Sequence, residues 1–405
     1  MQAQALGNVR VLDLTRVLAG PWCTQTLADM GADVIKIEHP ARGDDTRHWG
    51  PPYFRTTQGR ETRDATYFAS TNRNKRSVGV DIASGEGADL IRRLAAQCDV
   101  FIENFKVGDL ARYGLDYDSI RAVNPAIVYC SITGYGQTGP YADRPGYDFV
   151  FQAEGGLMSI TGEASGEPVR TGTSVVDLST GAAALSGILA ALYQRERTGE
   201  GQRIDVSLLG TTIAWMTYHA VAYFATGKAP GRTGSHHPSV SPYGGYPTKD
   251  GFLVVAIAFD SHWVKFCELV GRPELITDLR FASNPERVIN RAELDPIVVE
   301  ILADKSATEW AGIMDAAGIP CSPINDIAQA LALPQVAFQD YVASVPHPDI
   351  PDLKMPGIPI KFSADPSSIR RHPPKQGEHT AEVLAELGCD KSPASAQVPR
   401  VETLG

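Results

Sequence analysis

An acidic residue stands at the start of a long run of small and apolar residues in VRTGTSVVDLSTGAAALSGILAAL, residues 169–192. The pattern predicts that Asp177 is the N-cap of a helix, where its carboxylate would accept a backbone N–H bond. Capping alone would explain its presence. The positive end of a helix also keeps a carboxylate ionised, so Asp177 could equally be a nucleophile at neutral pH. The small residues 179–182 would leave room for a substrate or permit tight helix packing.

Two further segments carry side chains that could bind or react. Arg73, Lys75 and Arg76 lie together in NRNKRSVGVDI, residues 72–82. They form either a solvated basic face or a site that pairs with phosphate groups. Residues 134–162 combine a glycine-rich loop with Tyr147 and Asp148 after a Pro-Gly turn, which is either a surface loop or part of a site.

Several common kinds of site are poorly supported. His236 and His237 lack further ligands at zinc-like spacing, so we expect no metal site. No GxSxG elbow occurs, which argues against a Ser–His–Asp hydrolase. The first predicted strand-to-helix turn, TRVLAGPWC, carries no GxGxxG, and the chain has no GxxxxGK[ST] motif. Neither a nicotinamide dinucleotide nor a P-loop nucleotide is therefore expected.

The elements that must position these residues alternate between strands and helices. Strand-like segments occupy residues 9–14, 32–38, 76–82, 99–105 and 126–136, and helical spacing occurs at residues 20–31, 84–98 and 117–124. A strand, a helix and a strand within about thirty residues predict parallel pairing. We therefore predict an α/β fold with a Rossmann-like, doubly wound sheet that binds its ligand at the carboxyl ends of the strands. Phosphorylated carriers other than dinucleotides, coenzyme A among them, remain as ligands.

The rest of the chain predicts a second, smaller domain. A helical region ends within residues 191–220, and residues 225–251 are rich in Gly, Pro, Ser and His, as in a linker or a functional loop. A strand at 252–259 and helices at 261–271, 291–304 and 310–318 predict a smaller α+β domain. A proline-rich tail from about residue 333 ends in an amphipathic helix. We expect a large domain from residues 1–212, a linker and small domain from 213–330, and a return to the large domain over 331–405.

Composition narrows the class of protein. The chain has 405 residues, 43% of them hydrophobic, and a formal net charge of −10 at pH 7. This charge argues against binding to nucleic acid or to an anionic membrane. The start MQAQALGNVR lacks the pattern of a signal peptide, and the longest apolar runs are interrupted before the roughly 18 residues of a membrane span. Six scattered cysteines without a CxxC pair predict free thiols and a cytoplasmic location: Cys23, Cys98, Cys130, Cys267, Cys321 and Cys389.

Taken in order, several segments resemble the family III coenzyme A transferases, the CaiB/BaiF family. They cover nearly the whole chain and are far more specific together than any single motif: RVLDLTRVLAGPWCTQTLADMGADVIKIEHP, GDDTRHWGPP, NRNKRSVGVDI, ENFKVG, NPAIVYCSITGYGQTGP, PGYD, GGLMSITG and TGEGQRIDVSLL. The resemblance implies an interlocked homodimer of two ring-like chains. Each chain would have a Rossmann-like large domain and a small domain joined by two linkers.

The resemblance also implies roles for individual residues. Asp177 falls on the family's catalytic aspartate, so it is the expected nucleophile, and capping would be only part of its role. Gly244 and Gly245, in SPYGGYPTKDG, resemble the glycine loop that covers the active site in transferases. The expected substrate- and CoA-binding residues are Val17, Leu18, Ala19, His39, Asn104, Phe105, Arg112 and Asp148, with Arg73, Lys75 and Arg76 for the nucleotide phosphates. His39 stands where some members have an arginine, and Ala83 where a lysine is possible.

Tyr147 bears on the reaction type. Family members that racemise 2-methylacyl-CoA esters have a His before the Asp of the PGYD segment, whereas this chain has Tyr147. A phenol with an ordinary pKa near 10 is a poor base at neutral pH, which favours transfer over racemisation. A racemase and a non-catalytic protein that binds CoA esters remain as alternatives.

The implied reaction moves CoA from an acyl-CoA donor, with succinyl-CoA as the first choice, to a carboxylic acid. Asp177 would form a mixed anhydride and then an aspartyl-CoA thioester. Such exchange conserves the energy of the thioester bond, so no permanent cofactor is expected. A dicarboxylate acceptor such as malate, citramalate, mesaconate, itaconate or glutarate would suit a bidentate arginine, and oxalate, formate and carnitine-type acceptors remain open. Candidate partners for its carboxylate are Arg16, Arg47, Arg170 and His237, although each arginine could instead be a surface residue or bind a CoA phosphate.

Overall fold

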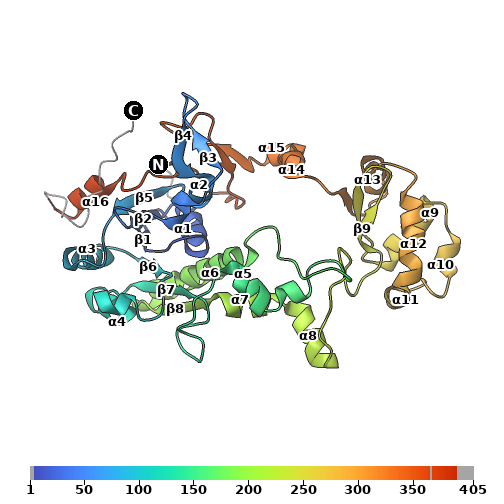
Figure 1. Ribbon diagram of the computed structural model, residues 1–405, viewed down its shortest axis with the longest axis horizontal. Helices are drawn as coiled ribbons and strands as arrows, with labels where there is room; N and C mark the ends of the chain where they lie inside the picture. Colours follow the sequence, from blue (N-terminus) through green and yellow to red (C-terminus); the bar gives the residue numbers. More distant parts are fainter. Residues whose placement is uncertain (1–3, 365–366, 390–405) are drawn as a thin grey trace. The chain divides into compact units, whose positions relative to one another are not determined.

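The computed structural model describes residues 4–364 and 367–389, which form two compact units (Figure 1). The first unit takes its described residues from Met1–Leu157, Thr171–Ala220 and Gln335–Gly405, and the second from Met158–Arg170 and Val221–Pro334. The expected boundaries at 212 and 330 lie close to these changes of unit. Residues 158–170, which we expected in the large domain, belong instead to the second unit.

The first unit is built on a parallel sheet of six strands, in the order β5-β2-β1-β6-β7-β8 (Figure 1). The strands are β1 (Arg10–Asp13), β2 (Asp33–Glu38), β5 (Lys75–Gly79), β6 (Val100–Glu103), β7 (Val128–Thr133) and β8 (Arg203–Ser207). Val11 of β1 is paired with Val34 on one side and Val100 on the other. The strand order therefore reverses between β1 and β6, and a crevice forms there outside the strand ends. The predicted α/β fold with a parallel sheet is confirmed.

Helices cover both faces of this sheet, because neighbouring strand residues point to opposite sides. Val11 packs with α1 (Ala19–Asp29) and α6 (Val175–Thr198) in one buried apolar cluster. Leu12 packs with α3 (Gly85–Ala95), α4 (Tyr117–Val123) and α16 (Thr380–Glu386) in a second cluster. The amphipathic helix expected near the C-terminal end is thus α16, and it covers the sheet of the first unit.

The sequence did not reveal every element of the first unit. RIDVS was expected inside a helical region, but it forms β8 and pairs in parallel with β7, for example Ile204 with Cys130. A five-residue segment is too short for its alternation of apolar residues to stand out between two helices. An antiparallel hairpin of β3 (Tyr53–Arg55) and β4 (Glu61–Ala65) was also not predicted. The remaining helices and strands of this unit are α2 (Thr66–Ala69), α5 (Asp148–Glu154), α7 (Leu208–Trp215), β12 (Val342–Ser344) and β13 (Lys354–Pro356). Two helices lie at the boundaries between the units: α8 (Thr217–Thr226) crosses the boundary after Ala220, and α15 (Pro334–Phe338) begins at the boundary after Pro334.

The second unit is drawn largely in yellow and orange in Figure 1 and has its own core. Its antiparallel sheet has the order β11-β10-β9, from β9 (Tyr243–Pro247), β10 (Phe252–Ala256) and β11 (Cys321–Pro323). Trp263 and Phe266 are fully buried against it. Its helices are α9 (Asp260–Leu269), α10 (Glu274–Thr277), α11 (Asn284–Ile289), α12 (Arg291–Leu302), α13 (Ala307–Ala316) and α14 (Ile327–Leu331).

Helix α6 is the longest described helix, and one side of it packs into the core of the first unit. By length and composition it is apolar enough to span a membrane, with a mean hydropathy of 1.7, whereas no such segment was expected. It packs against α1, β7 and β8, as core helices of globular proteins do. A Cβ on Gly181 would lie 2.5 Å from the carbonyl oxygen of Ala19, so the two helices approach at a residue without a side chain.

We expect Gly181→Ala to destabilise the first unit by about 1–3 kcal/mol, because the added methyl group meets backbone rather than a side chain that can move. Urea unfolding followed by far-UV circular dichroism measures this loss. Gly312→Ala in α13 is the control, since a Cβ there meets open space and alanine favours a helix by about 1 kcal/mol. Equal stability of Gly181→Ala and the parent protein would contradict the close approach.

Candidate active site

Two neighbouring pockets lie at the strand ends where the sheet order reverses. The first, here the Asp177 pocket, has a volume of about 330 Å³ and is lined by Arg16–Ala19, Asn104–Val107, Ile132–Gly134, Ala142–Tyr147 and Asp177, with Asp45, Asp109 and Leu208. The second, here the His39 pocket, has a volume of about 430 Å³ and is lined by the end of β2, His39, Arg42–Asp45 and Val80–Ala83, with Leu14, Arg16, Phe105, Asp109 and Tyr113. Because the two share Arg16, Asp45, Phe105 and Asp109, one elongated ligand could occupy both.

The loop between β1 and α1 forms one wall of the Asp177 pocket and is held in a strained conformation. The Nδ2 group of Asn104 donates to the carbonyl oxygen of Arg16 at 2.8 Å, and the backbone N–H of Arg16 donates to Oδ1 of Asn104 at 2.9 Å. Val17 then has a φ of 71°, which is unfavourable for a β-branched residue. Such strain persists only where the surroundings enforce it, so this loop has one fixed shape beside the pocket.

Asp177 occupies the third position of α6 and is not the N-cap that we expected. The N-cap is Ser174, whose side chain makes no capping bond. The capping acceptor comes from another helix: Oδ1 of Asp148 accepts the backbone N–H groups of Val176 at 2.8 Å and of Asp177 at 3.2 Å. The helix can therefore begin earlier than its own sequence suggests, and the side chain of Asp177 stays free of a capping role.

The environment of Asp177 makes its carboxyl group more basic, contrary to the expectation that the helix end keeps it fully ionised. Burial raises the pKa of Asp177 to about 7, and the negative charge of Asp148 adds to the effect. No donor contacts its carboxylate among residues 4–364 and 367–389. At neutral pH the group is therefore present in both forms, and its ionised form is more nucleophilic than an ordinary aspartate.

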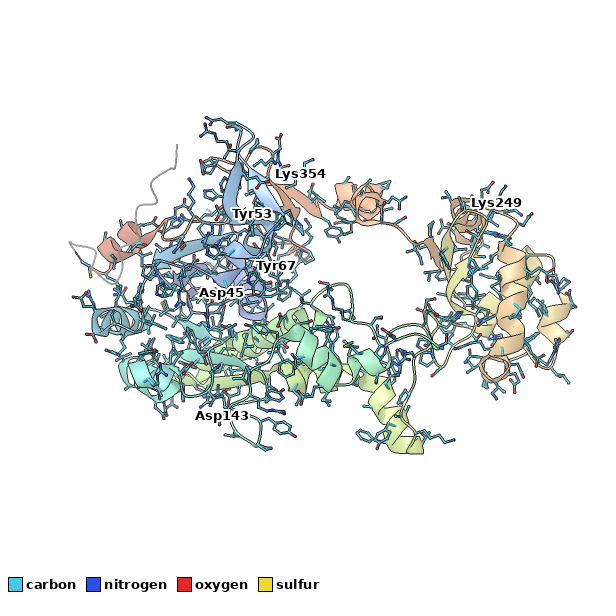
Figure 2. All side chains as sticks on the ribbon, in the orientation of Figure 1. Asp45, Tyr53, Tyr67, Asp143, Lys249 and Lys354 are labelled. Atoms are coloured by element: carbon cyan, nitrogen blue, oxygen red, sulfur yellow. The ribbon has the colours of Figure 1, made fainter. Side chains whose placement is uncertain are left out.

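Tyr67 on α2 is a site residue that the sequence analysis missed (Figure 2). Its hydroxyl group lies near Ser174, and burial together with the charge of Asp177 raises its pKa. The Tyr67 ring packs edge-on against Trp49, with centroids 5.3 Å apart. A neutral phenol thus lies at the start of α6. Its only signal in the sequence was an aromatic residue after a hairpin that was itself not predicted.

Tyr147 and Asp148 are adjacent in the sequence but face different surroundings. Tyr147 lines the Asp177 pocket and is 65% exposed, so the structure brings it together with Asp177 as expected. Asp148 is 6% exposed and does not line either pocket. Its oxygens contact backbone N–H groups of α6 and the amide of Gln152. Asp148 is therefore an internal partner of the helix rather than the substrate-binding residue that we expected.

The basic residues of NRNKRSVGVDI are used inside the protein. Arg73, Lys75 and Arg76 are each at least 96% buried. Their carboxylate partners are Asp29, Asp13 and Asp33, at 2.7, 3.2 and 2.6 Å respectively. None of the three lines the two pockets. We therefore no longer propose them as phosphate ligands; the cations that do line the pockets include Arg16, Arg42, Lys106 and Arg144.

The other expected CoA residues divide between the two pockets. Val17, Leu18, Ala19, Asn104 and Phe105 line the Asp177 pocket. His39 and Ala83 line the His39 pocket, where Nδ1 of His39 accepts the backbone N–H of Ala41 at 3.1 Å. Arg112 is exposed and lies just outside both pockets, paired with Asp109 at 3.5 Å and bonded to the hydroxyl of Tyr113. Both of its partners line the His39 pocket.

The residues that we expected to bind the acceptor lie in different parts of the structure. Arg16 lines both pockets. Arg47 is 3% exposed and makes two bonds of 2.8 Å to Glu38, so it has no free face for a substrate carboxylate and is no longer a candidate. Arg170, His237, Gly244 and Gly245 belong to the second unit. The two glycines lie in β9, paired with β10, and do not form the loop that we expected.

Comparisons with known proteins identify the family of this chain. The family model described as CoA-transferase family III matches residues 6–380. The succinate–glutarate CoA-transferase of Agrobacterium fabrum is 44% identical over 94% of this chain and 95% of its own. The human succinyl-CoA:glutarate CoA-transferase is 42% identical over 94% of this chain and 86% of its own.

A solved structure agrees as well. The crystal structure of a CAIB/BAIF family protein from Brucella suis matches with a TM-score of 0.84 and 42% identity, and the match covers 95% of this chain and all of that one. The family model, the relatives and the fold thus point to one enzyme class. The chain belongs to CoA-transferase family III, and its activity is the transfer of CoA.

Proposed function

We propose that this enzyme moves CoA from succinyl-CoA to a dicarboxylate acceptor, with glutarate as the first choice, and that Asp177 is the nucleophile. The observation that carries the proposal is the half-buried carboxyl group of Asp177, with its raised pKa, on the first turn of α6, opening on the pocket at the strand ends. Relatives named as succinyl-CoA:glutarate, D-citramalate and mesaconate transferases, at 35–44% identity, support the class of donor and acceptor.

The CoA ester would extend along the two pockets. The nucleotide end would occupy the His39 pocket, where Arg42 and Arg16 can meet phosphate groups. The pantetheine arm would pass Val17–Ala19 and bring the thioester to Asp177. The shared residues Arg16 and Phe105 would contact the ligand where one pocket leads into the other.

The transfer then runs through four exchanges at carbonyl carbons. The ionised carboxylate of Asp177 attacks the thioester carbonyl, the C–S bond breaks, and a succinyl-aspartyl anhydride and CoA thiolate result. The thiolate attacks the aspartyl carbonyl and releases succinate, which leaves an aspartyl-CoA thioester. The acceptor carboxylate attacks this thioester, and the CoA thiolate attacks the acceptor acyl group of the new anhydride. The products are the acceptor's CoA ester and free Asp177.

Two features of the first unit would lower the barriers of these steps. The N-terminal turn of α6 directs its positive end toward oxyanions formed at Asp177. The hydroxyl group of Tyr67 lies at the same helix end and keeps its proton at neutral pH, because its pKa is raised. Each tetrahedral intermediate would thus form beside hydrogen-bond donors.

We also propose that the enzyme works as a homodimer in the cytoplasm. Exposed apolar side chains of the first unit on α7 and the start of α8, namely Ile213 at 53%, Trp215 at 56% and Tyr218 at 52%, support an apolar surface that another chain covers. The described cysteines are free thiols, four of them buried, which suits a reducing compartment.

Intact mass spectrometry after brief mixing with succinyl-CoA tests the proposed function. We expect a covalent CoA or succinyl adduct that maps to Asp177 and that is discharged by glutarate, while pentanoate, which lacks the second carboxylate, discharges it more slowly. Deuterium exchange at the α-carbon of an acyl-CoA without an acceptor would instead indicate a racemase. Absence of any adduct, with succinyl-CoA and with other acyl-CoA donors, would refute the assignment.

A further inference from the structure

A chain of buried polar side chains leads from Asp177 into the protein through α5. Oδ1 of Asp148 accepts the backbone N–H groups of Val176 and Asp177, and its Oδ2 accepts the side-chain amide of Gln152 at 2.6 Å. The amide oxygen of Gln152 in turn accepts the backbone N–H of Thr171 at 2.9 Å. Gln152 is completely buried, and neither it nor Asp148 lines the two pockets.

We propose that Asp148 and Gln152 are positioning residues for the reaction of Asp177: Asp148, oriented by Gln152, fixes the first turn of α6 and controls the charge of the nucleophile. The inference rests on the proposed role of Asp177. It gives Asp148 a role different from the binding of substrate or CoA.

The first part of the role is geometric. The first four N–H groups of a helix have no partner within it, and one oxygen of Asp148 takes two of those of α6. An acceptor on the same helix could turn with it, whereas Asp148 is anchored on α5. Gln152 lies one turn further along α5 and holds the other oxygen, so the carboxylate has a single orientation. The backbone of Asp177 is therefore fixed relative to the pocket.

The second part of the role is electrostatic. The negative charge of Asp148, together with burial, raises the pKa of Asp177 to about 7. Repulsion between the two carboxylates exists only while Asp177 is free, because Asp177 becomes a neutral acyl group in the anhydride and in the aspartyl-CoA thioester. Asp148 therefore disfavours the free carboxylate relative to the covalent intermediates. Its charge would promote the attack and raise the steady level of the thioester.

The other charged groups near α6 do not supply this effect. Burial and the charge of Asp177 raise the pKa of Tyr67 on α2, so this phenol is neutral at pH 7. Burial raises the thiol pKa of Cys23 on α1 and of Cys130 on β7, which keeps both uncharged. Among the described residues, the remaining charged side chains on the packed elements are Arg203 and Asp205 on β8, paired at 2.8 Å, Glu154 on α5, paired with Arg144 at 3.4 Å, and Asp29 on α1, paired with Arg73 at 2.7 Å. The pocket wall adds Arg16, Asp45, Lys106, Asp109 and Asp143, and the far end of α6 carries Arg195, Glu196 and Arg197. None of these groups is a cause of the raised pKa of Asp177. α7 carries no titratable side chain.

The test compares Asp148→Asn with the parent enzyme, because an asparagine oxygen can still accept the two N–H groups while the charge is lost. Carbodiimide reacts with protonated carboxyl groups, so peptide mapping of its addition to Asp177 against pH reports ionisation without requiring turnover. We expect a labelling midpoint near pH 7 in the parent and one lower by about one pH unit or more in Asp148→Asn. The acid limb of adduct formation from succinyl-CoA should shift in the same direction.

Two more variants separate charge from structure. Gln152→Met leaves the charge of Asp148 but removes its orienting partner; we expect adduct formation to slow about tenfold with an unchanged KM for succinyl-CoA, since Gln152 does not line the pocket. Asp118→Asn, in the exposed first turn of α4, is the matched control and should leave both measurements unchanged. If Asp148→Asn is not folded, Gln152→Met carries the test of positioning.

The outcomes are distinguishable. Equal labelling midpoints in the parent and in folded Asp148→Asn would overturn the electrostatic part. An unchanged rate in Gln152→Met would overturn the positioning part. Absence of an adduct in the parent enzyme, with a labelling shift in Asp148→Asn, would reject the proposed nucleophile but retain the coupling between the two carboxylates.

Discussion

Asp177→Ala is expected to lower kcat for CoA transfer by at least about 10⁴-fold and to abolish the covalent adduct. Every exchange in the proposed reaction forms or breaks a bond to this carboxylate, and removal of a nucleophile that carries a covalent route has an effect of that order. The pocket itself changes little, because the Asp177 side chain accepts no hydrogen bond among the described residues. Binding of CoA esters, measured by calorimetry, should therefore stay within about tenfold of the parent.

Stability provides an internal control for this variant. The folded-state pKa of Asp177 lies above its unfolded value of about 3.9, so its ionisation opposes folding increasingly as the pH rises from 4 to 7. Asp177→Asn should therefore melt at a higher temperature than the parent at pH 8 and show a smaller gain at pH 5. Glu86→Ala, in the exposed first turn of α3, should retain activity. Turnover above one per cent of the parent in either Asp177 variant would reject the nucleophile assignment.

The parts of the fold that were predicted are those set by local pattern. Strands such as β1 and β2 and the helix α1 between them have apolar residues at regular spacing over several turns or strand residues, which is the signal that sequence reasoning detects. β8 and the hairpin of β3 and β4 depend on pairing partners distant in the chain. Gly201 before β8, for example, lies against the carbonyl of Ile127, a contact that no local pattern reveals.

The site residues, too, were predicted where local sequence carries the signal and were missed where contacts between distant residues decide. Asp177 was a candidate from its place before an apolar run, and the resemblance to a family favoured it as the nucleophile and added Val17–Ala19; the structure brings them into one pocket. The true acceptor at the start of α6, Asp148, lies 29 residues earlier in the chain and was not assigned this role. A sequence shows that basic residues are close together but not which acids neutralise them. Arg73 and its neighbours therefore suggested phosphate binding, although α1 and the adjacent strands supply their counterions.

The buried pair of Asp13 and Lys75 gives the largest expected effect on stability. Both side chains are fully buried beneath the loop that forms the pocket wall, with Nζ of Lys75 at 3.2 Å from Oδ2 of Asp13. Burial lowers the pKa of Lys75 to about 8, although the charge of Asp13 opposes this change. Asp13→Ala would leave this ammonium group without its main counterion and the Thr15 backbone N–H without its acceptor. We expect a loss of about 3–5 kcal/mol in the free energy of unfolding, measured by urea denaturation at pH 7.

The pH dependence and a second substitution identify the cause. In Asp13→Ala the folded-state pKa of Lys75 falls further below its unfolded value of about 10.4, so the unfolded chain binds more protons and stability rises with pH. The free energy of unfolding that Asp13→Ala loses relative to the parent should therefore be smaller at pH 9 than at pH 6. Adding Lys75→Met to Asp13→Ala should recover part of the stability, because it removes the unpaired charge. Glu61→Ala, which breaks the exposed pair with Arg55, should change stability by less than about 1 kcal/mol. A double variant no more stable than Asp13→Ala would show that lost packing, and not the buried charge, explains the effect.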